Sequence, residues 1–260
     1  MADADDKNIG TISDVFGRIA GGFARTGTVR STIHEALDHS HDRVEVNVRE
    51  MLSKLKLEPE AWLVEPTEEV LEAASKRGSE TMIISARALL DSSVIVFTHA
   101  IVDDAICSML EISARHDPKA WAARFDKRKI EVGDVTRDPE TAILEFAIAQ
   151  SIDRRKCPMP ENLKLLLGFF KPELKRDNLN EPNFFVYDDA RLDSFHENRR
   201  RIVHEQPLDN EDENWPTEHS WLRILMMRMV IMMCSTYSLQ IIPSEAFPPQ
   251  TCEDKKPPKD

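Results

Sequence analysis

The sequence predicts an all-α protein. Apolar residues recur at spacings of three and four through most of the chain, which is the periodicity of a helix with one buried face. The longest periodic segment, Ser79 to Arg115, contains neither Gly nor Pro over 37 residues. Prolines follow the other periodic segments and end them, as Pro207 and Pro243 do. We therefore expect a single domain of long antiparallel helices.

The N-terminal part predicts two different kinds of segment. Residues 1–30 hold five of the chain's eight glycines and few large apolar side chains, so we expect a flexible arm. Residues 31–57 carry apolar residues at helical spacing, and a second, short helix is expected from Thr67 to Lys76, ending at Gly78. Residues 31–78 would thus form an N-terminal helical extension.

The segment 79–115 predicts one long central helix. Its middle, 94–98, is β-branched enough to favour a strand, but the helical periodicity continues on both sides. Because it is apolar nearly all round from Val94 to Val102, we expect burial against several neighbours. Arg87 and Asp91 are four residues apart and are expected to form an ion pair within the helix.

Prolines and glycines cut residues 117–182 into short pieces. Short helices are expected near 119–129, 139–153 and 160–169. Two basic clusters, 124–129 and 154–156, are interpreted as solvated faces, with the alternative that they extend a track for phosphates.

The segment 188–206 predicts a helix that delivers cations to its C-terminal end. Three arginines, Arg199 to Arg201, and His204 lie on its last turns, and Pro207 stops it. This cluster of cations is suited to binding a phosphate group.

The final helix, 218–239, is the most apolar, but Arg223 and Arg228 lie within it and argue against a membrane span. Residues 243–260 are expected to form a disordered tail.

Composition limits the classes of partner. The net charge of −12 argues against a protein that coats nucleic acid through a generally positive surface, so any RNA contact must be local. The four cysteines have no paired spacing and the N-terminus has no apolar leader, which indicates a reduced, cytoplasmic protein. His34, His39 and His41 lack the further ligands that a metal site needs, so we expect no metal and no cofactor.

The segment Arg199–His204 resembles the R-x4-H signature of HEPN domains, which are small all-helical modules of many bacterial RNases in toxin–antitoxin and other defence systems. The same spacing also occurs at Arg191–His196. The second match has the better context: Ile-Val before the histidine, an amphipathic helix, an immediate helix stop and an apolar helix after a short loop. The resemblance covers residues 79–242. Arg200 stands where HEPN proteins often carry Asn, Asp or His, and Asn198 precedes the motif arginine instead.

The resemblance implies a HEPN-like helical bundle and a metal-independent endoribonuclease, in which the 2'-hydroxyl of RNA attacks its own phosphate. His204 would be the proton acceptor and Arg199 the phosphate clamp, with Arg200, Arg201 and Asn198 as substrate-binding residues. Arg199 and His204 lie about 140° apart on an ideal helix. The family's solution is a homodimer in which motifs from both chains line one cleft. RNA and a possible antitoxin protein are the implied partners, with no membrane.

Two other readings stay open. The chain could be a HEPN-like module that has lost catalysis and serves dimerisation, nucleotide binding or partner recruitment, which Arg200 and the acidic surface favour. It could also be an unrelated helical protein whose three arginines form a salt-bridged helix end.

Overall fold

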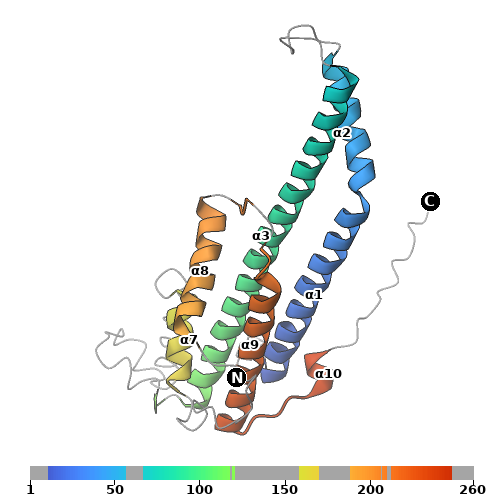
Figure 1. Cartoon of the computed structure of the whole chain (residues 1–260). Helices are drawn as coiled ribbons and strands as arrows, with labels where there is room; N and C mark the ends of the chain where they lie inside the picture. The colour runs from blue at the N-terminus through green and yellow to red at the C-terminus, as the bar shows by residue number, and fades with distance from the viewer. Residues whose placement is uncertain are drawn as a thin grey trace, which may run out of the picture. The chain divides into compact units, whose positions relative to one another are not determined.

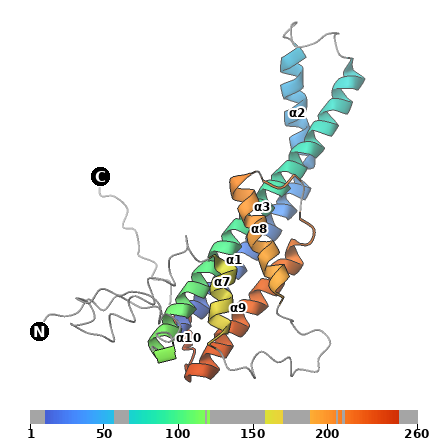
Figure 2. The same ribbon diagram turned by 90° about the vertical axis from the view of Figure 1, so that its left-hand side faces the viewer.

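The computed structural model describes residues 11–56, 67–117, 119–120, 158–169, 188–205, 207–209 and 212–247. All the regular elements in these ranges are helices, which confirms the predicted fold class (Figures 1 and 2). They are α1 (Ile12–His39), α2 (His41–Lys56), α3 (Glu68–His116), α7 (Met159–Leu167), α8 (Asp189–His204), α9 (Trp215–Tyr237) and α10 (Pro243–Ala246).

The helices form two compact units instead of the single domain that we expected. One unit holds residues up to Gly21, Ile101–Asp188 and the chain from Leu222, and the other holds Gly22–Ala100 and Asp189–Trp221. Helices α1, α3 and α9 each contribute to both units. The 49 residues of α3 give it a length of roughly 70 Å, which is more than one small core can cover.

The expected flexible arm is wrong for residues 12–30, because α1 begins at Ile12. In the first unit, Ile12, Val15 and Ile19 are buried at spacings of three and four. Full burial of such a side chain stabilises a protein by about 1.5–3 kcal/mol, whereas a glycine inside a helix costs about 1 kcal/mol. The apolar spacing therefore outweighs the glycines. The proposed domain boundary at residue 30 falls inside a helix.

In the same unit, residues 243–247 are ordered, although we expected a disordered tail from residue 243 onward. The main-chain N–H of Ile242 donates to Ser13 Oγ at 2.9 Å, and the rings of Phe247 and Phe16 meet edge to face, 6.1 Å between centroids. A Cβ on Gly17 would collide with the carbonyl of Ala246, so the close approach of α10 to α1 requires glycine there. Residues 243–247 are thus ordered, and 248–260 lie outside the described residues.

In the second unit, α2 and the first half of α3 lie side by side in both views (Figures 1 and 2). Gly78 does not end a helix as predicted, because α3 continues through it from Glu68. A Cβ on Gly78 would approach Val48 Cγ1 to 3.0 Å, so the glycine serves the packing of α2 on α3. The helix expected at 31–57 is divided at Ser40, whose hydroxyl donates to the carbonyl of Leu37.

The other predicted helices are confirmed where they are described. The segment 188–206 is α8, the final apolar helix is α9 and the segment 160–169 is α7. Most of the helix expected at 119–129, the helix at 139–153 and both basic clusters lie outside the described residues. By length and composition α3 could cross a membrane, and 56% of its most apolar window is buried inside the protein.

Candidate functional site

The C-terminal end of α8 carries the predicted cationic residues, and the structure gives them different surroundings. Arg200, Arg201 and His204 are exposed, whereas Arg199 is half-buried. Arg200 donates from Nε and Nη2 to the carboxylate of Glu197, at 2.9 and 2.7 Å. This bond raises the pKa of Arg200 and lowers the pKa of Glu197. One of the three arginines is therefore held by a carboxylate of its own helix.

Arg199 and His204 lie five residues apart on α8, about 140° round an ideal helix, and they differ in burial. Arg199 follows the buried Phe195 by one helical turn, and its positive charge contributes to lowering the pKa of the buried His99. His204, five residues further on, is exposed. In the described part of the chain, no hydrogen bond or ion pair engages the side chains of Arg199, Arg201 or His204. Their donors remain available to an anion.

The earlier histidine of the helix belongs to a buried imidazole pair. His99 of α3 is 7% exposed, and its Nε2 lies 2.9 Å from Nδ1 of His196. One ring must donate and the other accept in this hydrogen bond, so the two rings cannot both be cationic. Burial, followed by the charges of His196 and Arg199, lowers the pKa of His99 from its ordinary 6.5 to about 3. His99 is therefore neutral at pH 7.

We expect His99 to make stability depend on pH. Between its folded pKa of about 3 and the unfolded value of 6.5, the unfolded chain binds a proton that the folded chain does not. The contribution of His99 is therefore complete above pH 6.5 and is lost as the pH falls toward 3. His99→Gln should remove about 1.4 kcal/mol per pH unit of slope in the free energy of unfolding across this range. Urea titrations from pH 4 to 7 would measure it, and an unchanged slope would contradict it.

Both residues of the first R-x4-H match are engaged in contacts within the protein. Nε of Arg191 donates to both carboxylate oxygens of Glu218 at 2.9 Å, and its guanidinium lies 4.6 Å from the centre of the Trp221 ring. His196 is bonded to His99. These contacts join α8 to α9 and α3. A packing role therefore accounts for Arg191 and His196.

A buried carboxylate holds the loop that follows His204. Asp91 of α3 accepts from Arg30 Nε at 2.7 Å, from His34 Nε2 at 3.2 Å and from the main-chain N–H of Asp212 at 2.9 Å. The neighbouring Ser92 Oγ accepts from the main-chain N–H of Leu208 at 2.9 Å. The loop between α8 and α9 is thus fixed to α3 at two points.

The predicted Arg87–Asp91 ion pair is wrong. Arg87 instead pairs with Asp38 of α1, and Asp91 pairs with Arg30 and His34 of the same helix. Spacing along one helix identified residues that could meet on its surface. This spacing carries no information about α1, and the observed partners of Arg87 and Asp91 lie on that helix.

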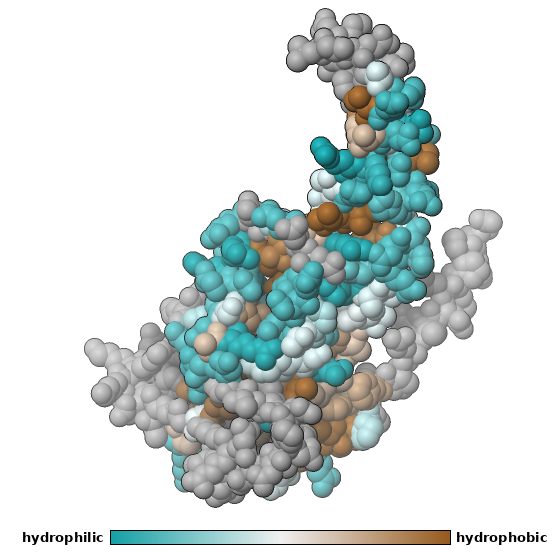
Figure 3. Space-filling view, viewed as in Figure 1, coloured by the Kyte–Doolittle hydropathy of each residue, from teal (hydrophilic) through white to brown (hydrophobic). Residues whose placement is uncertain are grey.

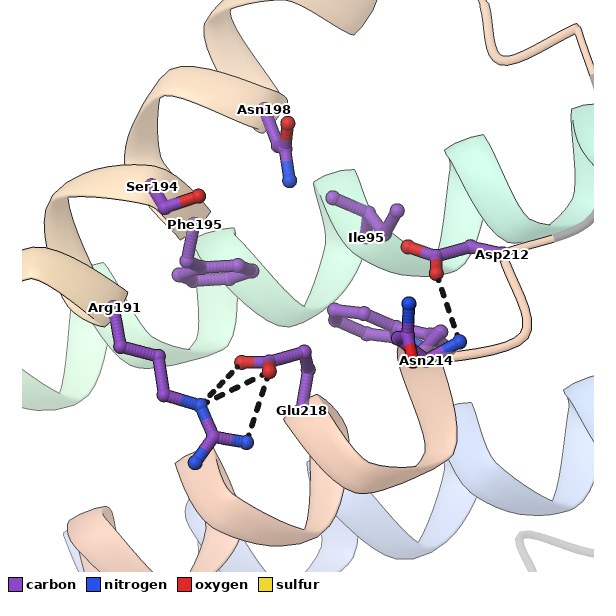
Figure 4. Close-up of a pocket in the computed structure, with 9 residues that line it drawn as sticks. Ile95, Arg191, Ser194, Phe195, Asn198, Asp212, Asn214 and Glu218 are labelled. Atoms are coloured by element: carbon purple, nitrogen blue, oxygen red, sulfur yellow. Dashed lines mark hydrogen bonds and ion pairs between the residues drawn. The ribbon is translucent and has the colours of Figure 1, made fainter. Parts of the chain in front are cut away.

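A pocket of about 300 Å³, which we call the α8–α9 pocket, is lined by residues of α8 up to Asn198, the residue before Arg199 (Figure 4). It is formed by α8, the start of α9, the loop between them and α3. Asn198, one of the predicted substrate-binding residues, is among its lining residues. The full lining is Ile95, Arg191, Ser194, Phe195, Asn198, Asp212, Asn214, Trp215 and Glu218.

Sequence reasoning missed His99 and Glu218, and it gave Asp91 the wrong partner. His99 and Asp91 lie in the apolar central helix and are buried, and a buried polar side chain requires a partner. That rule marks both residues as members of an internal network. It does not identify the partners, because they lie on other helices.

Among the described residues, no three His, Cys, Asp or Glu side chains are placed to hold a metal ion. No protein-family model, no curated protein and no solved structure matches the chain.

Proposed function

We propose that the chain is a metal-independent endoribonuclease of HEPN type, in which Arg199 and His204 act on one phosphodiester. The supporting observation is the cationic end of α8. The protein has 46 acidic and 34 basic residues, so carboxylates are in excess. Arg199, Arg201 and His204 nevertheless make no ion pair within the described residues. A phosphate is the anion that a planar guanidinium fork binds well.

The chemistry needs only these side chains and the substrate. The 2'-hydroxyl of the RNA attacks the adjacent phosphorus while His204 takes its proton, and the bond from phosphorus to the 5'-oxygen breaks as this oxygen takes a proton from solvent water. Arg199 stabilises the charge that develops on the phosphoryl oxygens, assisted by Arg201. The products are a 2',3'-cyclic phosphate and a 5'-hydroxyl.

The active site would contain two copies of the chain. Arg199 is half-buried and His204 is exposed, about 140° further round α8, so one copy cannot aim both side chains at one phosphate. A two-fold axis beside the end of α8 would place Arg199 of one copy opposite His204 of the other.

The product chemistry tests the proposal. RNA cleavage by the purified protein should persist in EDTA and leave 2',3'-cyclic phosphate ends. A strand with a single ribonucleotide in DNA should be cut only at that ribonucleotide, because 2'-deoxy positions lack the attacking hydroxyl. Cleavage of all-DNA strands, or products that all carry 5'-phosphates, would contradict the mechanism.

Mixing two inactive variants tests the composite site. In a mixed dimer of His204→Ala and Arg199→Ala chains, one of the two sites keeps both wild-type residues. Random exchange of subunits should therefore restore roughly a quarter of the wild-type rate. No recovery in dimers that demonstrably exchange would place both residues in one chain.

A catalytically silent HEPN-like partner-binding module is the second candidate, and an apolar groove between α2 and α3 favours it. The groove has a volume of about 340 Å³ and is lined by Leu37, Val44, Asn47, Val48, Met51, Met82, Ile83 and Ala86. Met51 and Met82 are about half exposed, and Figure 3 shows such apolar residues among hydrophilic ones on this part of the molecule. Methionine-rich surfaces suit adaptable binding. A dimer without RNase activity would support this candidate.

A further inference from the structure

The α8–α9 pocket combines an apolar wall with neutral hydrogen-bonding groups. The rings of Phe195 and Trp215 are nearly parallel, with 6.1 Å between centroids and 22° between planes, and Ile95 lies beside them. Figure 4 shows the amide of Asn198 pointing from α8 into the space between Phe195 and Ile95. Ser194 and Asn214 add a hydroxyl and a second amide. A few polar groups on an apolar wall are typical of a small-molecule site.

Trp215 adds its ring to the apolar wall of the pocket. The residue is 2% exposed, and its indole Nε1–H is closed to solvent and has no hydrogen-bond partner among the described residues. Because this N–H is not open to the pocket, Trp215 offers a bound molecule apolar contact and no hydrogen bond.

The charges of the pocket favour a ring over a phosphate. Its single cation, Arg191, is neutralised by Glu218, and the carboxylate of Asp212 accepts the main-chain N–H of Asn214 at 3.0 Å. The lining therefore has one cation and two carboxylates, which repel an anion. Arg199 and Arg201 follow Asn198 on α8 but are not part of the lining. A nucleotide would thus place its base in the pocket and its phosphate outside, toward these arginines.

We infer that the α8–α9 pocket binds a single nucleobase, with a preference for adenine. The inference rests on the proposed function, which supplies the RNA strand that carries the base. An asparagine amide offers a donor and an acceptor that match N6 and N7 of adenine. An arginine fork would match O6 and N7 of guanine, but Glu218 occupies Arg191. The volume of about 300 Å³ accommodates one base and not a stacked run of bases.

Calorimetric titration of the full chain with mononucleotides tests the inference without any cleavage step. AMP should bind roughly ten-fold more tightly than GMP, and ribose 5-phosphate should bind more weakly than either. Asn198→Leu keeps the size of the side chain and removes its hydrogen bonds, so it should weaken AMP binding by roughly ten-fold. Gln240→Leu, at an exposed position after α9, also removes a side-chain amide; it is the control and should bind AMP as the wild type does.

The outcomes separate the pocket from the nuclease. AMP binding that is lost in Asn198→Leu and retained in His204→Ala supports the pocket whether or not RNA is cut. If RNA is cut but AMP and ribose 5-phosphate bind alike, the base site is overturned and the nuclease stands. Equal binding of AMP and GMP by the wild-type chain overturns the adenine preference, and this comparison does not depend on the folding of any variant.

The source of the base is tested by cleavage of RNA. If the pocket takes a base of the substrate strand, cleavage should favour a fixed position relative to adenosine, and Asn198→Leu should lower cleavage at that position relative to cleavage elsewhere in the same strand. Free AMP should compete with such a substrate. An adenosine preference that Asn198→Leu leaves unchanged would show that the base is read elsewhere and would overturn the assignment.

Discussion

His204→Ala is expected to reduce the rate of RNA cleavage by roughly 10²- to 10⁴-fold, because the variant lacks the group that accepts the 2'-hydroxyl proton. His204 is exposed and makes no hydrogen bond or ion pair in the described part of the chain, so the variant should keep the wild-type free energy of unfolding. Single-turnover cleavage of a labelled oligoribonucleotide, together with urea unfolding, measures both quantities.

His39→Ala is the matched control for this experiment. His39 is also an exposed histidine at the last position of a helix, in this case α1. The control removes the same helix-end interaction without touching the proposed site. Equal losses of cleavage in the two variants, or no loss in His204→Ala, would contradict the assignment of His204 as the base.

Asp91→Ala is expected to destabilise the protein by about 3–5 kcal/mol, because it leaves the guanidinium of Arg30 buried without its carboxylate. Arg30 has a side-chain exposure of 15% and Asp91 of 0%, so solvent can replace the lost partner only in part. The main-chain N–H of Asp212 would lose its acceptor as well. Urea unfolding at pH 7 would measure the change.

Asp38→Ala provides the surface counterpart. Its carboxylate also pairs with an arginine, Arg87, but it is 59% exposed, and such pairs contribute about 0–1 kcal/mol. In a second variant, Arg30→Met with Asp91→Leu, apolar side chains replace both charges and should recover part of the stability. A loss in Asp91→Ala no larger than that in Asp38→Ala would show that the buried pair contributes little.

The fold class and most of the helices could be predicted because helical periodicity is a local property of the sequence. Helix α8 is an example. The spacing of Leu192 and Phe195 indicates the helix and Pro207 indicates its end, both without reference to the rest of the chain. The same local reasoning misjudged Gly78 and the glycines of α1. A glycine that ends a helix and a glycine that lets another helix approach are identical in sequence.

The candidate site was predictable only in part. The sequence placed Arg199, His204 and Asn198 on one helix, and the structure contains that helix as α8. The pairing of His99 with His196 and the anchoring of the loop by Asp91 depend on contacts between residues 97 and 121 positions apart in the sequence. No local pattern encodes such contacts.

The anchoring of the α8–α9 loop also bears on how the protein could diverge. The hydrogen bonds described between the loop and Asp91, Ser92 and Arg30 go to main-chain atoms: the N–H of Leu208, the N–H of Asp212 and the carbonyl of Asp212. Any residue with a main-chain N–H satisfies these contacts, so proline alone is excluded at 208 and 212. Residues of α1 and α3 hold the main chain of the loop in position. The side chains of the loop can therefore be substituted without loss of these hydrogen bonds.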